Sequence, residues 1–205
     1  AIVAAYTEDT VSDGYLNRVT VTLSETFFQA DAGDLANAFD VLNGDANYTG
    51  EVAAKTGDTT AQVSFSSDAW GTSDTPSITL AAGQLDDLNG VGGNSLTGLQ
   101  TFSLTTDAAP PAIVAAYTED TIRDGYLNRV TVTLSEDCYE TGVFNPATAF
   151  DVLNGTTTYS GENATLINTT TAQVTFSSAA WGTSDVPSIT LAAGQLDDLN
   201  GVGGN

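Results

Sequence analysis

Residues 18–24 read RVTVTLS, and this short stretch decides the fold class. Its apolar residues Val19, Val21 and Leu23 alternate with polar ones, so an extended chain places them on one face. The alternation predicts a half-buried antiparallel β-strand. Similar runs, bounded by Gly, Asn, Asp, Ser and Pro, lie at residues 2–7, 38–42, 48–53, 60–65, 77–81 and 96–105. Seven such strands predict an all-β, immunoglobulin-like sandwich.

The stretch belongs to a segment that occurs twice. Residues 1–25, AIVAAYTEDTVSDGYLNRVTVTLSE, return at residues 112–136 as AIVAAYTEDTIRDGYLNRVTVTLSE, and the offset of 111 residues continues without a gap to residue 205. Each copy is long enough to enclose its own core. The sequence therefore predicts two domains in tandem, residues 1–111 with a linker and residues 112–205. Residues 26–35 and 51–58 differ between the copies and are interpreted as loops and strand ends.

Aromatic residues are expected to fill much of each core. They are Phe39, Phe65 and Trp70 in the first copy and Phe150, Phe176 and Trp181 in the second. Because Trp70 lies beside a turn, the alternative is an exposed ring that stacks on a sugar. Cys138 stands where the first copy has Phe27, and we expect it to be a small apolar packing residue.

The composition excludes several classes of partner and catalyst. The chain has 26 acidic and 4 basic residues, a formal net charge of −22, no histidine and one cysteine. This charge repels nucleic acid and anionic membranes. Without histidine, Ser-His-Asp and Cys-His catalysis and imidazole zinc sites are excluded, and one cysteine excludes a disulfide framework. The charge favours either bound divalent cations or a salt-rich environment, and the two are compatible.

No enzymatic activity is expected. The carboxylate pair Asp86 and Asp87 is adjacent in sequence, whereas glycoside hydrolysis needs two carboxylates across a cleft. The sequence contains no apolar run of membrane-spanning length and no signal peptide, as in a mature or excised chain. Four Asn-x-Ser/Thr sequons, at Asn47, Asn154, Asn163 and Asn168, are candidate glycosylation sites.

An acidic loop is the main candidate site. Residues 9–17, DTVSDGYLN, offer side-chain oxygens at relative positions one, five and nine, from Asp9, Asp13 and Asn17. Position six is Gly14, and position seven is Tyr15, whose backbone carbonyl is available. This spacing resembles that of a calcium loop, because calcium prefers oxygen ligands. With the preceding glutamates, the predicted ligands are Glu8, Asp9, Asp13, Tyr15 and Asn17, and in the second copy Glu119, Asp120, Asp124, Tyr126 and Asn128.

Two positions depart from the calcium pattern. Val11 occupies position three and Thr20 occupies position twelve, where the full pattern has carboxylates. Other segments would therefore have to complete the coordination shell. The alternative interpretation is an Asx-type turn in which Gly14 takes a positive φ and no metal is bound.

Strand order predicts which segments join the loop. In a seven-strand sandwich the loop at residues 66–74, SSDAWGTSD, lies beside the first loop and contributes Asp68 and Asp74. The linker leaves from the same end with Asp107. The loop before the last strand of the second copy would contribute Asp197 and Asp198. We expect calcium to bind at this junction and fix the angle between the copies, and Pro110 and Pro111 stiffen the linker.

The chain resembles a family of repeats. DGYLNRVTVTLSE at residues 13–25, together with the loop LDDLNGVGGN at residues 85–94, is similar to the bacterial and archaeal Ig-like repeats of cell-surface and secreted proteins. The resemblance covers both copies. It implies an extracellular spacer, stalk, adhesin or surface-layer component, with calcium bound in some members.

The leading functional hypothesis is a structural or adhesive module that forms a calcium-stiffened rod, filament, stalk or surface-layer segment, with copies of itself as partners. The alternative is a carbohydrate- or ligand-binding module that uses aromatic residues such as Tyr15, Phe28 and Tyr48. The second copy stops before a counterpart of residues 96–105. We expect its last strand to come from a longer array or from a neighbouring molecule by strand donation.

Overall fold

The computed structural model describes residues 1–29, 35–44, 46–49, 52–66, 70–87, 97–104, 108–139, 146–160, 163–177 and 181–198. The chain divides into two compact units, one containing Ala1–Thr10 and Tyr15–Ala109, the other containing Pro110–Asn205. Apart from two short helical turns, η1 (Leu35–Ala38) and α1 (Pro146–Ala149), the regular structure of the described residues is antiparallel β-sheet. This confirms the all-β prediction. No helix in these ranges is long and apolar enough to span a membrane.

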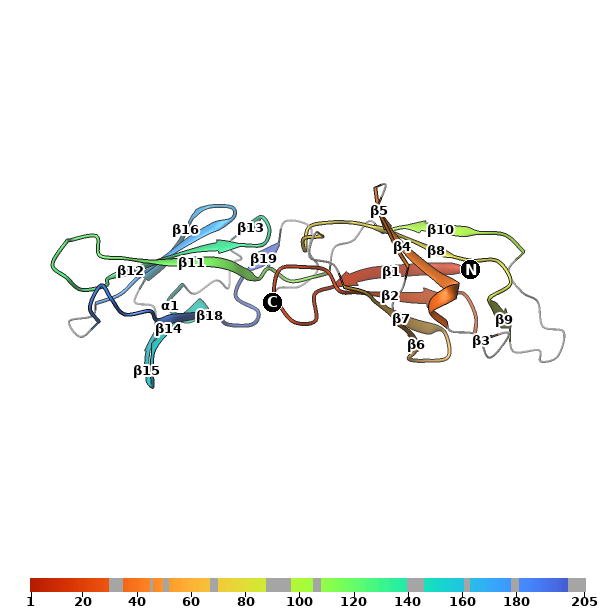
Figure 1. The fold of residues 1–205 in the computed structure, drawn as a ribbon, viewed down its shortest axis with the longest axis horizontal. Coiled ribbons are helices and arrows are strands. Elements are labelled where there is room, and N and C mark those ends of the chain that lie inside the picture. Colours follow the sequence, from red (N-terminus) through yellow and green to blue (C-terminus); the bar gives the residue numbers. More distant parts are fainter. Residues whose placement is uncertain are drawn as a thin grey trace. The chain divides into compact units, whose positions relative to one another are not determined.

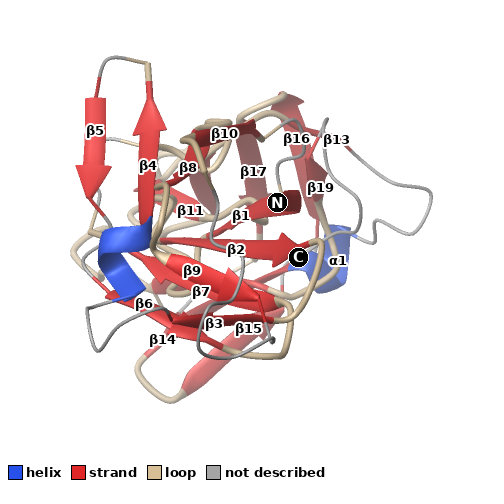
Figure 2. Ribbon diagram, turned by 90° about the vertical axis from the view of Figure 1, so that its right-hand side faces the viewer, coloured by secondary structure: helices blue, strands red, loops and turns tan. Residues whose placement is uncertain are grey.

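The first unit contains two four-stranded sheets. One has the order β1-β2-β7-β6, with bounds Ile2–Glu8, Arg18–Leu23, Thr60–Ser64 and Val52–Lys55 (Figure 1). The other has the order β10-β8-β4-β5, with bounds Gln100–Ser103, Ser77–Leu80, Phe39–Asn43 and Ala46–Thr49. A third, two-stranded sheet pairs β3 (Phe27–Gln29) with β9 (Leu85–Asp87). Figure 2 shows η1 at the start of β4, with β5 beside β4.

Strand number is where the prediction and the structure differ. The pattern predicted seven strands, and the described part of the first unit contains ten. The expected strand at residues 48–53 is divided, because β5 pairs with β4 whereas β6 pairs with β7 in the other sheet. The short strands β3 and β9 form in segments that we interpreted as loops.

The second unit repeats this plan. Its four-stranded sheet has the order β11-β12-β17-β16, with bounds Ile113–Glu119, Arg129–Leu134, Thr171–Thr175 and Asn163–Asn168. A three-stranded sheet has the order β15-β14-β18, with bounds Thr157–Ser160, Phe150–Asn154 and Ser188–Leu191. The pair β13 (Cys138–Tyr139) and β19 (Asp197–Asp198) corresponds to β3 and β9.

The core of each unit is formed by the predicted residues. Val19 and Val21 are fully buried and Leu23 is 5% exposed. Buried residues from both four-stranded sheets of the first unit form one hydrophobic cluster, an arrangement compatible with a β-sandwich. Trp70 is also buried, and its ring lies 5.4 Å from the rings of both Tyr48 and Phe65. The interpretation of Trp70 as an exposed sugar-stacking ring is therefore wrong.

Candidate functional site

The acidic loop of the second copy connects β11 to β12 and is closed by the Asp120 carboxylate. Oδ1 of Asp120 accepts hydrogen bonds from the backbone N–H groups of Arg123, at 2.6 Å, and Asp124, at 3.3 Å. Oδ2 accepts a third from the N–H of Gly125, at 2.9 Å. Oδ1 of Asp124 in turn accepts the N–H of Tyr126, at 3.0 Å. The loop thus folds around its own carboxylates.

The same turn is present in both copies. Oδ1 of Asn128 accepts the backbone N–H of Thr121, at 3.0 Å, and its hydroxyl, at 2.9 Å. In the first copy, Asn17 and Thr10 form these two bonds at 3.1 and 3.0 Å. Gly14 and Gly125 both have a φ of 90°. The Asx-type turn with a positive-φ glycine, which we considered as the alternative to calcium binding, is therefore formed.

The acidic loop lies beside the loop that contains the core tryptophan, as predicted. In the first copy the N–H of Leu16 donates to the carbonyl of Trp70, at 2.8 Å, and Tyr15 forms an isolated bridge with Gly71. Leu127 and Trp181 repeat the hydrogen bond at 2.8 Å. The backbone N–H of Asp74 donates within its own turn to the carbonyl of Gly71, at 3.1 Å. Two neighbouring loops therefore form one surface in each copy.

The glutamates that precede the loops form ion pairs. Glu8 is paired with Arg18, at 2.8 Å from Nε to Oε2 and 2.6 Å from Nη2 to Oε1, and also accepts a hydrogen bond from the hydroxyl of Thr20. Burial raises the pKa of the Glu8 carboxyl, but the bonds from Arg18 and Thr20 outweigh it and the net pKa is lowered. Sequence reasoning assigned Glu8 and Glu119 to calcium and missed these arginines. Cross-strand register is the signal that would have found them.

The turn uses some of the oxygen positions that a calcium ion would need. Calcium binds about six to eight oxygen atoms, and a carboxylate has about four acceptor positions. Three positions of Asp120 are taken by backbone amides. Within the described ranges, no three or more His, Cys, Asp or Glu residues are grouped so that they could hold a metal ion. A calcium ion would therefore need backbone carbonyls, amide oxygens and water to complete its shell.

The predicted junction ligands fall partly outside the described residues. Asp68 and Asp107 lie in segments that the structure does not describe. Asp197 and Asp198 were expected in a loop, but their backbone forms β19, which pairs with Cys138 and Tyr139 in β13. That part of the prediction is corrected. The reason is that this polar segment forms a strand that pairs with the strand containing the buried residue Cys138.

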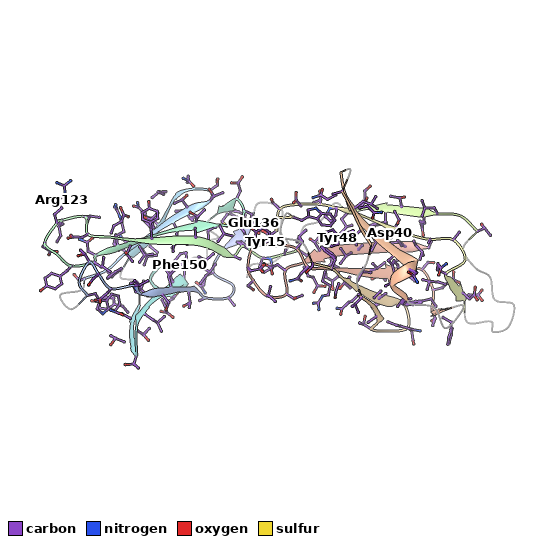
Figure 3. All side chains as sticks on the ribbon, in the orientation of Figure 1. Tyr15, Asp40, Tyr48, Arg123, Glu136 and Phe150 are labelled. Carbon is purple, nitrogen blue, oxygen red and sulfur yellow. The ribbon has the colours of Figure 1, made fainter. Side chains whose placement is uncertain are left out.

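An open hollow of about 660 Å³ adjoins the acidic loop of the second copy. Its polar lining includes Asp124, Asn128 and Tyr126, and the Tyr126 side chain is 42% exposed. Arg123 lies in the loop that connects β11 to β12 and points away from the strands (Figure 3). The hollow therefore offers carboxylate, amide and aromatic groups together.

The chain matches no protein-family model, no curated protein and no solved structure.

The aromatic candidates are not equivalent. Tyr15 and Phe28 are exposed, whereas Tyr48 packs on Phe65 and Trp70. The ammonium group of Lys55 lies 5.0 Å above the ring of Phe28. The four predicted glycosylation sites lie in strands β5, β14 and β16, and of these Asn47, Asn163 and Asn168 are exposed.

Proposed function

We propose that the chain is a structural or adhesive extracellular module, built from tandem Ig-like β-sandwich repeats that act in a rod, filament, stalk or surface layer. The supporting observation is that polar loops are repeated as completely as the cores. Both copies have the Glu–Arg–Thr cluster, the Asn–Thr turn and the bridge to the tryptophan loop. Loops that carry no common task are free to diverge, as residues 26–35 have done.

The proposal includes calcium as a stiffening ligand. At a net charge of −22 the acidic loops repel one another, and bound divalent cations would reduce this repulsion. Calcium would use the oxygens of the acidic loop that remain after the turn is formed, together with water. On this view the ion tightens a loop that folds without it.

Small-angle X-ray scattering of the chain, with calcium and with a chelator, tests this mechanical function. We expect chelation to increase flexibility while each repeat stays folded, as circular dichroism would verify. The double variant Asp13→Ala and Asp124→Ala should behave in calcium like the parent in chelator. Equal flexibility in both conditions would overturn the calcium-stiffened form, and the acidic loops would then serve solubility or adaptation to salt. Antibody labelling of intact source cells tests the extracellular location.

The hollow beside the acidic loop favours a second candidate, a carbohydrate- or ligand-binding module. Tyr126 offers a ring for stacking, and Asp124 and Asn128 offer hydrogen-bonding groups beside it. Glycan-array binding of the chain, compared with Tyr126→Ala, tests this function. Tyr139→Ala is the matched control, because Tyr139 is equally exposed, at 42%, and does not line the hollow.

A further inference from the structure

The hairpin turn that joins β16 to β17 contains one of the four sequons, Asn168-Thr169-Thr170. Oδ1 of Asn168 accepts the backbone N–H of Thr170, at 2.9 Å, and also its hydroxyl, at 3.2 Å. Asn168 is the last residue of β16, and its side chain is exposed. The asparagine and the threonine that define the sequon are therefore in direct contact, in an Asx-type turn at the surface.

The hydrogen bonds of this turn fix the direction of the Asn168 amide. A backbone N–H can only donate, so the amide atom that faces it is the oxygen Oδ1. Both donors of Thr170 lie on that side of the amide, which places the nitrogen Nδ2 on the side away from the turn. Because the side chain is exposed, this nitrogen is directed outward.

The turn is anchored through its backbone rather than through Asn168. The carbonyl of Thr169 accepts the N–H of Cys138, at 2.7 Å, and the carbonyl of Thr170 accepts the N–H of Leu134, at 2.8 Å. These bonds hold the turn against the end of β12 and the residues that follow it. The amide of Asn168 can therefore be modified without breaking the contacts that hold the hairpin in place.

The other three sequons have a different geometry. Asn47 and Asn163 lie within strands β5 and β16, where an extended backbone separates alternate Cα atoms by about 7 Å. Asn154 ends β14 and is only partly exposed, and its backbone pairs with Thr157 across the hairpin. Asn168 is thus the sequon asparagine whose amide a turn orients toward solvent.

The first copy provides an internal comparison. Its corresponding turn is anchored in the same way, because the carbonyl of Asp58 accepts the N–H of Phe27, at 3.2 Å, and the carbonyl of Thr59 accepts the N–H of Leu23, at 2.8 Å. The position of the asparagine is occupied by Gly57, so this turn has the threonine of the sequon without its acceptor. A modification at this turn would distinguish the second copy from the first.

We propose that Asn168 is an N-glycosylation site, and that it is the sequon that the folded chain presents to a glycosyltransferase. Nδ2 of Asn168 attacks the anomeric carbon of a lipid-linked saccharide pyrophosphate. The new C–N bond replaces the C–O bond to the pyrophosphate, which leaves with the bonding electrons, and Nδ2 loses one proton to a base of the transferase. The attached saccharide adds a bulky, hydrophilic group to the second repeat. Its occurrence at a cell surface rests on the proposed extracellular function, whereas the acceptor geometry rests only on the turn.

A transfer assay with purified components tests the proposal. The folded chain is incubated with a single-subunit oligosaccharyltransferase and a lipid-linked oligosaccharide, and fragmentation mass spectrometry assigns the modified asparagine. We expect transfer to Asn168 to be at least about tenfold faster than transfer to Asn47, Asn154 or Asn163, because the turn orients the acceptor in advance. Absence of transfer to the folded chain, or equal or faster transfer to another sequon, would overturn the proposal.

Four unfolded peptides, each containing one sequon, are the control for the enzyme. All four should accept the oligosaccharide without the preference for Asn168, because they lack the fold, and the same preference among the peptides would count against the turn as its cause. Asn168→Gln should remove the modification from the folded chain, whereas Asn163→Gln, in the same hairpin, should leave it. Because the assay needs neither calcium nor a cell, its failure would leave the scattering and antibody-labelling tests of the proposed function intact.

Discussion

Glu119 and Arg129 lie directly opposite each other on β11 and β12 and form a bidentate ion pair, with both N–O distances at 2.7 Å. The hydroxyl of Thr131 donates a third hydrogen bond to the same carboxylate, at 2.7 Å. The pair lies where the hairpin opens into the acidic loop, and Glu8 and Arg18 repeat it in the first copy. It therefore holds the two strands in register on either side of the candidate site.

This pair makes the stability of the second unit dependent on pH. Hydrogen bonding from Arg129 lowers the pKa of Glu119, and burial opposes the shift. The pKa of Glu119 is lower in the folded state than in the unfolded state. The ion pair therefore contributes fully to the free energy of unfolding above the unfolded-state pKa, and this contribution is lost as the pH falls through the folded-state pKa. Glu119→Gln should cost up to about 1 kcal/mol at neutral pH and little in acid. Thermal melting across pH measures this, and a constant cost would contradict it. Glu25→Gln is the exposed control.

Burial of a charge in the core should be far more costly. Val21→Asp places a carboxylate at a fully buried position and should lower the free energy of unfolding by about 3 kcal/mol or more. Val132→Asp should do the same in the second copy. Val52→Asp is the matched control, because Val52 is 61% exposed. Chemical denaturation measures all three, and similar midpoints for Val21→Asp and Val52→Asp would mean that the strand faces the other way.

Calcium binding can be separated from the turn by titration. Isothermal titration of the metal-stripped chain with calcium should show binding that Asp13→Ala and Asp124→Ala weaken. At a hundredfold excess of calcium over the dissociation constant, occupied sites should add about 2.7 kcal/mol to stability. Asp58→Ala, an exposed residue elsewhere, should leave binding unchanged. Absence of heat at millimolar calcium would sink the calcium assignment.

The turn itself should contribute stability without any metal. In chelator, Asp120→Ala should cost about 1–2 kcal/mol, because three backbone N–H groups lose their acceptor. Asp124→Ala should cost less, since the structure gives its side chain one such bond, from Tyr126. Gly125→Ala should cost about 1 kcal/mol through its φ of 90° alone, because no atom within 4 Å obstructs a new Cβ. Equal melting temperatures for Asp120→Ala and the parent would contradict this account.

Alternation along the sequence predicted the facing of β2, because burial on one face imposes period two. It failed between Tyr48 and Ala53, where the chain leaves one sheet for the other and both parts still alternate. The ion pair was missed because Glu8 and Arg18 become neighbours only once the hairpin register is known. The sequence left two interpretations of the acidic loop open, a calcium site and an Asx-type turn. The hydrogen bonds to the carboxylates that reveal the turn depend on backbone geometry, which the sequence pattern does not specify.

Phe27 and Cys138 occupy the same position in the two copies, and both are buried, at 3% and 1% exposure. The second repeat therefore contains a buried thiol at a position where the nearly identical first repeat has a phenylalanine. A thiol reagent reacts with Cys138 only when the second repeat opens, so the modification rate reports the opening of that repeat alone. Tryptophan fluorescence cannot separate the two, because Trp70 and Trp181 have matching surroundings. The reactivity of Cys138 therefore allows the stability of the second repeat to be measured separately from that of the nearly identical first repeat.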